Sequence, residues 1–251
     1  MNLVEISVDS LNEKLDEAYH AAKSFKPHSN IRGGSYFECA LKTYHSVVGT
    51  PPPVIIGEPG WELSAEVGKA IHNVIQKQLV KAGIVLVLPA KSIEVVVNSA
   101  KYKYAGVIDG IIKNAQGDVS LLEIKNIDDK YFNPKDDNYT RYYLDKLAHY
   151  EMQLQAYMHL WRHPETNYQA TQGRILVINL NYPKQRRLYK ASYDPVLMGS
   201  EFERIAGLKV AIESKTPPAP EPSRGPCTFC NWQKICPTTE KERRNGGFKH
   251  V

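Results

Sequence analysis

The sequence predicts an α/β protein in which a central mixed β-sheet is flanked by helices. Two observations carry this prediction. The first is a pair of segments rich in β-branched and aliphatic residues, at 102–113 and 119–126, that flank a polar turn as the strands of a β-hairpin do. The second is that stretches with helical and with strand periodicity alternate around this hairpin. We therefore expect one core with an appended element at each end.

Residues 1–60 form the first of three expected parts, a helical segment. Ser10 and Glu13 have the spacing of a capping box, and apolar residues recur at helical spacing after them. A short second helix is expected to carry Cys39. The run of three prolines after Thr50 then predicts a loop.

Residues 61–215 form the expected core. Apolar residues at helical spacing predict a long helix over 61–82, and strands are predicted near 84–88 and 92–98, ahead of the hairpin. Residues 128–143 contain several aspartates and tyrosines. We expect this stretch to be a mobile loop at the edge of the functional site.

The remainder of the core continues the alternation of helices and strands. A helix is predicted over 144–162, strands near 173–181 and 186–193, and a further helix over about 195–214. The third part, residues 216–251, contains a stiff proline-rich linker, a cysteine-containing segment and a charged tail.

Three charged residues, Asp109, Glu123 and Lys125, lie on the predicted hairpin. Glu123 and Lys125 are two positions apart, so their side chains share one face, and antiparallel pairing can bring Asp109 beside them. Charges on an otherwise apolar sheet are costly unless they are paired or bind a metal. Two carboxylates for a divalent cation and a lysine that offsets charge on phosphorus suit metal-assisted phosphodiester hydrolysis. The alternative is an ordinary cross-strand ion pair.

Composition narrows the class of protein. No run of about 18 apolar residues is present, so we expect no membrane span. The first residues lack the basic and apolar regions of a secretory signal, and we expect a cytoplasmic protein. In that compartment the four cysteines favour metal ligation over disulfides. The formal charge of +5 permits binding to an anionic polymer such as DNA.

The pattern of Asp109, Glu123 and Lys125, a D…E-x-K signature, resembles the PD-(D/E)xK nuclease superfamily. Glu94, ahead of the strand that carries Asp109, also has a counterpart in many members. The resemblance implies a restriction-endonuclease-like core. It also implies that the protein hydrolyses phosphodiester bonds with Mg2+ or Mn2+.

Two further motifs resemble the RecB-like branch of this superfamily, and they occur in the family's order along the chain. Gly68 and His72 match its G-x-x-x-H helix, whose histidine joins the metal site. Gln153 and Tyr157 match its Q-x-x-x-Y motif, one turn apart on a predicted helix. Without this context, the alternative is that the histidine is an ordinary core or surface residue and that Gln153 and Tyr157 serve only in packing and capping.

The resemblance assigns roles to these residues. Asp109 and Glu123 are expected to bind the cation, with His72 and the main-chain carbonyl of Ile124 as further ligands. Lys125 is expected to position the attacking water or to stabilise the transition state.

The Q-x-x-x-Y pair completes the expected catalytic set. Gln153 and Tyr157 are expected to position DNA or a metal-bound water. Together with the hairpin residues, they make a nuclease site the principal functional expectation.

The four cysteines sharpen the resemblance. Cys39 stands alone, whereas Cys227, Cys230 and Cys236 form a C-x2-C-x5-C segment. This arrangement is similar to the iron–sulfur RecB-like exonucleases, including the CRISPR-associated Cas-four family and its phage relatives. Four thiolates suit a 4Fe-4S cluster, but they could also hold structural Zn2+, and spacing does not decide between the two. The resemblance favours iron, in a clasp that joins N- and C-terminal segments.

The resemblance implies a DNA exonuclease acting on single-stranded ends, in recombination, repair or CRISPR-type end processing. A recombination or CRISPR integration protein is then an expected partner, in a prokaryotic cell or a phage-infected host. Two alternatives remain open. One is a structure-selective endonuclease, and the other is a catalytically silent DNA-binding subunit of a larger nuclease complex.

Overall fold

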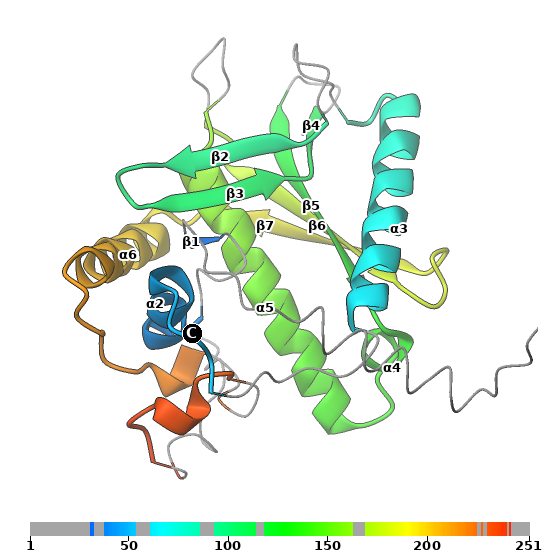
Figure 1. Cartoon of the computed structure of the whole chain (residues 1–251). Coiled ribbons are helices and arrows are strands. Elements are labelled where there is room, and N and C mark those ends of the chain that lie inside the picture. The colour runs from blue at the N-terminus through cyan, green and yellow to red at the C-terminus, as the bar shows by residue number, and fades with distance from the viewer. Residues whose placement is uncertain are drawn as a thin grey trace, which may run out of the picture.

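The structure, a computed structural model, describes residues 31–32, 38–53, 61–85, 93–113, 118–162, 169–224, 227, 230–239 and 241. Its strands form two sheets that are connected through one continuous run of chain (Figure 1). The seven strands are β1 (Ile31–Arg32), β2 (Val95–Ser99), β3 (Tyr104–Ile108), β4 (Gly110–Lys113), β5 (Val119–Ile127), β6 (Gln172–Asn179) and β7 (Arg186–Ser192).

The sheets are mixed, as the sequence predicts. The smaller sheet has the order β1-β3-β2 and the larger has the order β4-β5-β6-β7. The β1–β3 and β5–β6 pairs are parallel, and the others are antiparallel. The predicted hairpin is present as β4 and β5, with Gly110 opposite Leu122 at the end of the pairing.

Helices cover both faces of the larger sheet. The described helices are α2 (Ala40–Val48), α3 (Trp61–Lys81), α4 (Asp129–Phe132), α5 (Asp137–Leu160) and α6 (Pro195–Glu213), with short 3-10 turns at Pro222–Arg224 and Gln233–Ile235. Figure 1 shows α5 crossing the sheet, α3 running beside β5, and α2 lying next to α6.

Residue alternation along β5 decides which helix meets which face. Leu121 belongs to the buried cluster that contains Leu154 of α5, whereas Leu122 and Ile124 belong to the cluster that contains Ile75 of α3. Successive strand residues point to opposite faces. The side chains of Glu123 and Lys125 therefore point to the face that α5 covers.

A glycine in β3 allows α5 to lie close to the sheet. A Cβ atom at Gly106 would come within 2.5 Å of Tyr157 Cε1, a separation that side chains do not reach without movement. The absence of a side chain at this position lets Tyr157 of α5 lie directly against β3.

The predicted α/β class is confirmed, and most predicted elements match the observed ones. The expected mobile loop at 128–143 is wrong, because this stretch contains α4 and the first two turns of α5. The Asp128 side chain accepts a hydrogen bond from the Lys130 N–H at 3.1 Å. Asp136 likewise accepts one from the Tyr139 N–H at 3.0 Å. These aspartates therefore begin helices.

The described residues include none of one further predicted element and only part of another. The expected helix after Ser10 lies outside the described residues. Of the strand expected near 84–88, the structure describes an isolated bridge between Val85 and Ile112. Among the described helices, none is long and apolar enough to cross a membrane.

Candidate active site

The site lies where the chain passes from one sheet to the other. Asp109 is the single residue between β3, which pairs with β2, and β4, which pairs with β5. Because β4 pairing ends at Leu122, the next part of β5 has no β4 partner. The Ile124 N–H instead donates to Asp109 Oδ2 at 2.6 Å. This bond holds the carboxylate against the open edge of β5.

Helix α3 brings a histidine to the same carboxylate. His72 Nε2 lies 3.0 Å from Asp109 Oδ2, and Gln76, one turn later, donates to the Asp109 main-chain oxygen at 2.7 Å. The helix is held on β5 by Asn126, whose amide donates to the Gly68 carbonyl at 2.9 Å. The G-x-x-x-H spacing thus combines a docking contact with a site residue one turn away.

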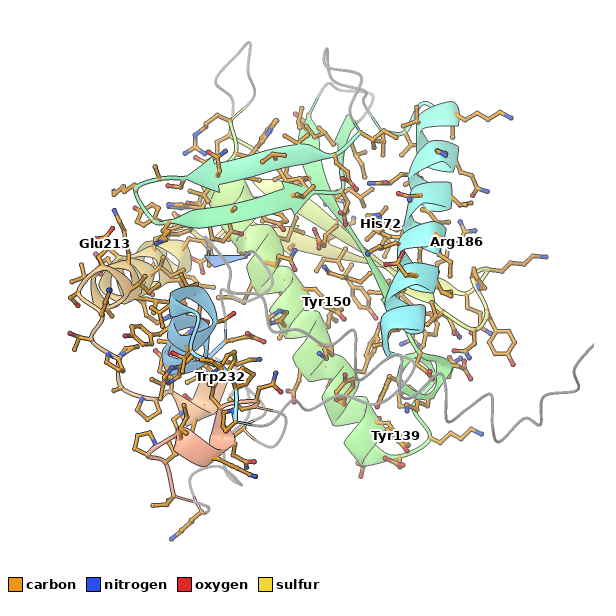
Figure 2. All side chains as sticks on the ribbon, viewed as in Figure 1. His72, Tyr139, Tyr150, Arg186, Glu213 and Trp232 are labelled. Carbon is orange, nitrogen blue, oxygen red and sulfur yellow. The ribbon has the colours of Figure 1, made fainter. Side chains whose placement is uncertain are left out.

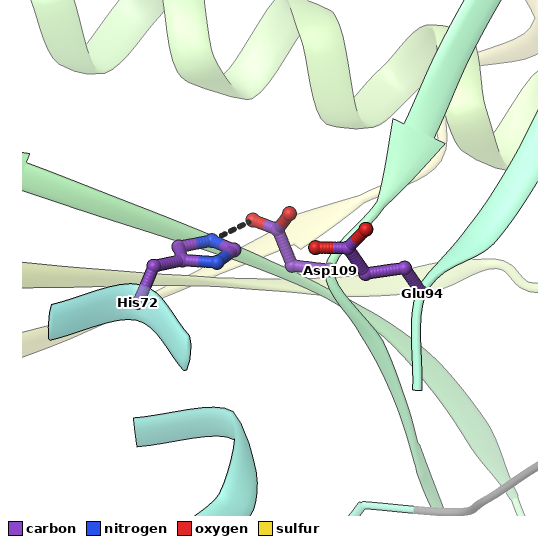
Figure 3. Close-up of side chains that lie close together, drawn as sticks. All are labelled: His72, Glu94 and Asp109. Atoms are coloured by element: carbon purple, nitrogen blue, oxygen red, sulfur yellow. Dashed lines mark ion pairs between the residues drawn. The ribbon is translucent and has the colours of Figure 1, made fainter. Parts of the chain in front are cut away.

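Three donor groups converge at this point. One nitrogen of His72 and one oxygen each of Glu94 and Asp109 lie within 4.8 Å of one another (Figure 3). Imidazole nitrogen and carboxylate oxygens are ligands that divalent cations accept. The structure therefore assembles a cation-compatible donor set from α3, the segment before β2 and the β3–β4 junction.

A second group of side chains surrounds Glu123, which is 1% exposed. Its Oε1 atom lies 2.5 Å from Lys125 Nζ and accepts a hydrogen bond from Gln153 Nε2 at 2.9 Å. The same Gln153 nitrogen donates to the Tyr157 hydroxyl at 2.7 Å. The predicted Q-x-x-x-Y pair therefore lies at the site, where it fixes the position of a buried carboxylate.

The other Glu123 oxygen supports a metal role. Glu123 Oε2 is buried and accepts no hydrogen bond from any described residue. A buried carboxylate oxygen without a donor is costly, and a cation is one group that can compensate it. In the structure Glu123 lies outside the His72–Glu94–Asp109 group. Its predicted place as a metal ligand, like that of the Ile124 carbonyl, stays a prediction.

The electrostatics keep Lys125 charged. Burial disfavours its ammonium form, but the charges of Glu123 and Asp109 outweigh burial and raise the Lys125 pKa. The pKa of Glu123 is raised to about 7, mainly by burial; Lys125 partly opposes this rise and Asp109 adds to it. Burial also lowers the pKa of His72, yet the hydrogen bond and charge of Asp109 raise it on balance.

Sequence-based reasoning missed Gln76 and Tyr150. Gln76 is four residues after His72, so its place on the same face of α3 was available as a signal. Tyr150 lies under Lys125, whose Nζ is 5.2 Å from the ring centroid. Its position three residues before Gln153 on the same helix was the corresponding signal.

The four cysteines line one pocket, although Cys39 is 188 positions from Cys227 in the chain. The Glu221 N–H donates to Cys39 Sγ at 3.2 Å, and Cys236 Sγ lies 3.0 Å from the Thr238 hydroxyl. No three of the four sulfurs lie within 4.8 Å of one another. The sulfurs therefore do not stand in the closed tetrahedral arrangement of a zinc site, in which thiolates are roughly 4 Å apart.

Charged and aromatic contacts attach the C-terminal segment to the rest of the protein. Glu201 of α6, which is 5% exposed, accepts hydrogen bonds from two Arg224 nitrogens at 2.9 and 2.6 Å. Trp232 stacks on His45 of α2 with ring centroids 6.0 Å apart, and its indole N–H donates to the Thr50 carbonyl at 3.0 Å. These contacts bring the two cysteine-bearing segments together.

A comparison with protein families identifies the fold. The sequence profile of the PD-(D/E)XK nuclease superfamily matches residues 90–237, more than half of the chain. The protein belongs to the PD-(D/E)XK nuclease superfamily. The matched range includes Asp109, Glu123 and Lys125, which the structure brings close together on and beside β5.

Solved structures of similar shape were also found. SSO0001 is 20% identical with a TM-score of 0.47, and the alignment covers 90% of this chain and 93% of that one. An alkaline exonuclease, LHK-Exo from Laribacter hongkongensis, is 12% identical with a TM-score of 0.45, covering 80% and 94%. Its complex with dAMP gives 12% identity, a TM-score of 0.42, and coverage of 75% and 90%. No curated protein sequence matches the chain.

For this PD-(D/E)XK protein, the two raised pKa values predict that cation binding weakens in acid. As the cation ligands that the sequence predicts, Glu123 would have to be a carboxylate and His72 a neutral ring. The Glu123 carboxyl, with its pKa of about 7, binds a proton as the pH falls through that value. We expect the apparent affinity for Mn2+ to fall about tenfold between pH 8 and pH 6, measured by calorimetry without DNA.

Glu123→Gln provides the matched comparison, because it keeps the size of the side chain and cannot titrate. In this variant, Mn2+ affinity should be lower at pH 8, and its remaining pH dependence should come from His72. An affinity that is equal at pH 6 and pH 8 in the unmodified protein would remove the titrating carboxylate from the cation site.

Proposed function

We propose that this protein is a deoxyribonuclease that requires Mg2+ or Mn2+ and removes nucleotides from single-stranded DNA ends. The observation that carries the proposal is that two groups of polar side chains, one around Asp109 and one around Glu123, lie next to each other at β5. His72, Glu94 and Asp109 offer three converging ligand atoms, and beside them Glu123 has a buried oxygen to which no described residue donates a hydrogen bond. A charged lysine adjoins both groups.

These residues fit a divalent cation. His72, Asp109, Glu123 and the main-chain carbonyl of Ile124 would hold it. The N–H and C=O of a strand residue point to the same side, and the Ile124 N–H already points at Asp109. A bound cation would supply charge for the phosphoryl group and would lower the pKa of water.

The protein's own side chains supply the remaining functions. Lys125 Nζ is held by Glu123 and its side chain is 25% exposed, so it can reach a phosphate oxygen at the surface of the site. In this position the ammonium offsets the negative charge that builds up on phosphorus, or orients the attacking water. Gln153 prevents rotation of the Glu123 carboxylate and ties it to Tyr157. Both are positioning residues in this proposal.

The decisive experiment is digestion of end-labelled DNA with Mg2+, Mn2+ or a chelator. Labelled single strands should shorten from an end in the presence of either cation and should survive with chelator. Circular single-stranded DNA should stay intact, because it offers no end. Cutting of the circle would favour the endonuclease alternative. Binding without cutting of any substrate would favour the silent DNA-binding subunit.

We also propose that Cys39, Cys227, Cys230 and Cys236 bind a 4Fe-4S cluster that clasps the C-terminal segment onto α2. The common pocket and the N–H donated to Cys39 Sγ support this proposal. Such N–H···S bonds are typical of iron–sulfur ligands. The resemblance of the cysteine spacing to that of iron–sulfur RecB-like exonucleases favours iron over a single Zn2+ ion.

The cluster proposal predicts a structural role. Closing a loop of 188 residues restricts the unfolded chain by about 5 kcal/mol in the chain-entropy treatment of cross-links. Anaerobically purified protein should contain iron and acid-labile sulfide, and Cys227→Ala should contain neither and melt at a lower temperature. Stoichiometric zinc without sulfide would replace the cluster by a zinc site and leave the nuclease proposal unchanged.

The proposed biological setting follows from the proposed activity. Trimming of single-stranded ends serves recombination, repair or CRISPR-type end processing, in the cytoplasm of a prokaryotic cell or a phage-infected host. A recombination or integration protein is the proposed partner. The division at 1–60, 61–215 and 216–251 is proposed to separate the clasp segments from the catalytic core.

A further inference from the structure

A strip of alternating aromatic and basic side chains leads from the protein surface to Lys125. It consists of Tyr131 on α4 and Tyr142, Lys146 and Tyr150 on α5, and we refer to it as the tyrosine–lysine strip. The rings of Tyr131 and Tyr142 lie 4.2 Å apart, centroid to centroid, with planes inclined by 30°. Lys146 Nζ is 5.4 Å from the Tyr142 centroid, and Lys125 Nζ is 5.2 Å from the Tyr150 centroid.

The helix explains why these residues form a continuous path. Tyr142, Lys146, Tyr150 and Gln153 recur every three or four positions, so they share one face of α5. The eight-residue step from Tyr142 to Tyr150 spans about 12 Å at 1.5 Å per residue. That length is roughly that of a few nucleotides.

Exposure falls along the strip toward the site. Tyr142 is 37% exposed, Lys146 and Tyr150 are half-buried, and Gln153 is buried beside Glu123. Figure 2 shows Tyr139, a neighbour of Tyr131, at the outer end of α5 and Tyr150 at its middle. The strip therefore begins at the surface and ends at the catalytic centre.

The charge of Lys146 is not balanced within the described part of the protein. No described carboxylate lies within ion-pair distance of its ammonium, and the nearest acidic influence, Glu38, is already paired with Lys42 at 2.7 Å. Burial lowers the Lys146 pKa; Glu38 opposes this effect, whereas Lys42 and Lys125 add to it. Holding a half-buried cation among other cations is unfavourable unless an anion binds there.

We propose that the tyrosine–lysine strip binds the single strand that leads to the cleavage site, with a backbone phosphate on Lys146 and a base on the Tyr131–Tyr142 pair. This inference rests on the proposed nuclease function and names the path of its substrate. Stacking on aromatic rings needs bases that are unpaired, and it tolerates any sequence. The strip therefore selects single strands over duplex, and Lys146 and Tyr142 act as positioning residues.

The test is binding of a fluorescent oligothymidylate, followed by anisotropy in the presence of chelator, so that no cleavage is needed. Lys146→Met keeps the aliphatic stem and removes the charge. We expect it to weaken binding and to reduce the slope of log affinity against log salt by about 0.7, the value for one phosphate contact on a single strand. Lys146→Arg should restore the slope.

The aromatic half of the strip has its own variants. Tyr142→Ala should weaken binding to the single strand about tenfold, as loss of one stacked base does, and should leave blunt duplex binding unchanged. Tyr142→Phe keeps the ring and should bind like the unmodified protein. Lys101→Ala is the matched control for Lys146→Met. Lys101 also lies over a tyrosine ring, 4.8 Å from the Tyr102 centroid, but it belongs to the β2–β3 turn, away from the strip.

An unchanged salt slope in Lys146→Met would overturn the inference, as would equal losses of single-strand and duplex binding in Tyr142→Ala. Melting curves of both variants should match the unmodified protein, so that a loss of binding reports on the strip. Cleavage distinguishes this inference from the proposed function. If the protein cuts DNA but the strip variants bind DNA as the unmodified protein does, only the inference about the strip is wrong. If the strip variants bind less well but the unmodified protein does not cut DNA, only the nuclease proposal is wrong.

Discussion

Replacing Lys125 with alanine is expected to lower DNA cleavage about 10³-fold while DNA binding persists. The ammonium is held at 2.5 Å from Glu123 and is kept charged by its surroundings, so the variant loses a preorganised positive charge at the reacting phosphate. Removal of one such group costs on the order of 10²–10³ in turnover in other enzymes. Single-turnover digestion of a labelled single strand at saturating Mg2+ measures the loss.

The double variant Lys125→Ala/Asp109→Asn should be scarcely slower than either single variant, because residues that act as one unit are not additive. Lys190→Ala is the control, since Lys190 is an exposed lysine on β7 outside the site. Near-normal cleavage by Lys125→Ala would show that this lysine serves only as the ion-pair partner of Glu123.

Outside the cysteines, the largest expected effect on stability comes from Arg224→Met. Glu201 is buried and accepts two hydrogen bonds from Arg224 and one from Arg204 Nε at 3.1 Å. Loss of Arg224 leaves the buried carboxylate with one partner. Breaking a buried pair costs about 3–5 kcal/mol, and we expect about 3 kcal/mol because Arg224 is 28% exposed. The melting temperature should fall by roughly 6–12 °C.

A double-mutant cycle separates this ion pair from general damage. Glu201→Met/Arg224→Met removes both charges, and an apolar pair of similar volume is often as stable as the buried ion pair that it replaces. The double variant should therefore melt above Arg224→Met. If the two single losses simply add, the pair contributes no coupling and the C-terminal segment is held by other contacts.

The hairpin and its charged residues could be predicted from sequence because the relevant signals are local. β-Branched residues flank a polar turn, and the two-residue period places Glu123 and Lys125 on one face. The G-x-x-x-H and Q-x-x-x-Y spacings likewise place two residues one helical turn apart. Each of these relations spans only a few positions, so periodicity is sufficient to establish it.

What could not be predicted depends on how distant elements pack. The resemblance names Glu94, but no local pattern specifies that the segment before β2, α3 and the β3–β4 junction meet and so bring it to His72 and Asp109. The stretch at 128–143 was misassigned because Asp128 and Asp136 were read as loop residues, although aspartate is also a strong helix N-cap.

The distance in sequence between Cys39 and Cys227 has a consequence for how the protein is made. A ribosome needs about 10–40 s to advance the 188 positions from Cys39 to Cys227. The strands β3, β4 and β5 and helix α5 are synthesised during that time. The side of the pocket that is lined by Cys227, Cys230 and Cys236 has not yet been synthesised. The proposed cluster could therefore assemble only after the C-terminal cysteines have been synthesised. A polypeptide terminated before residue 227 would retain all the proposed catalytic side chains and could not assemble the proposed cluster.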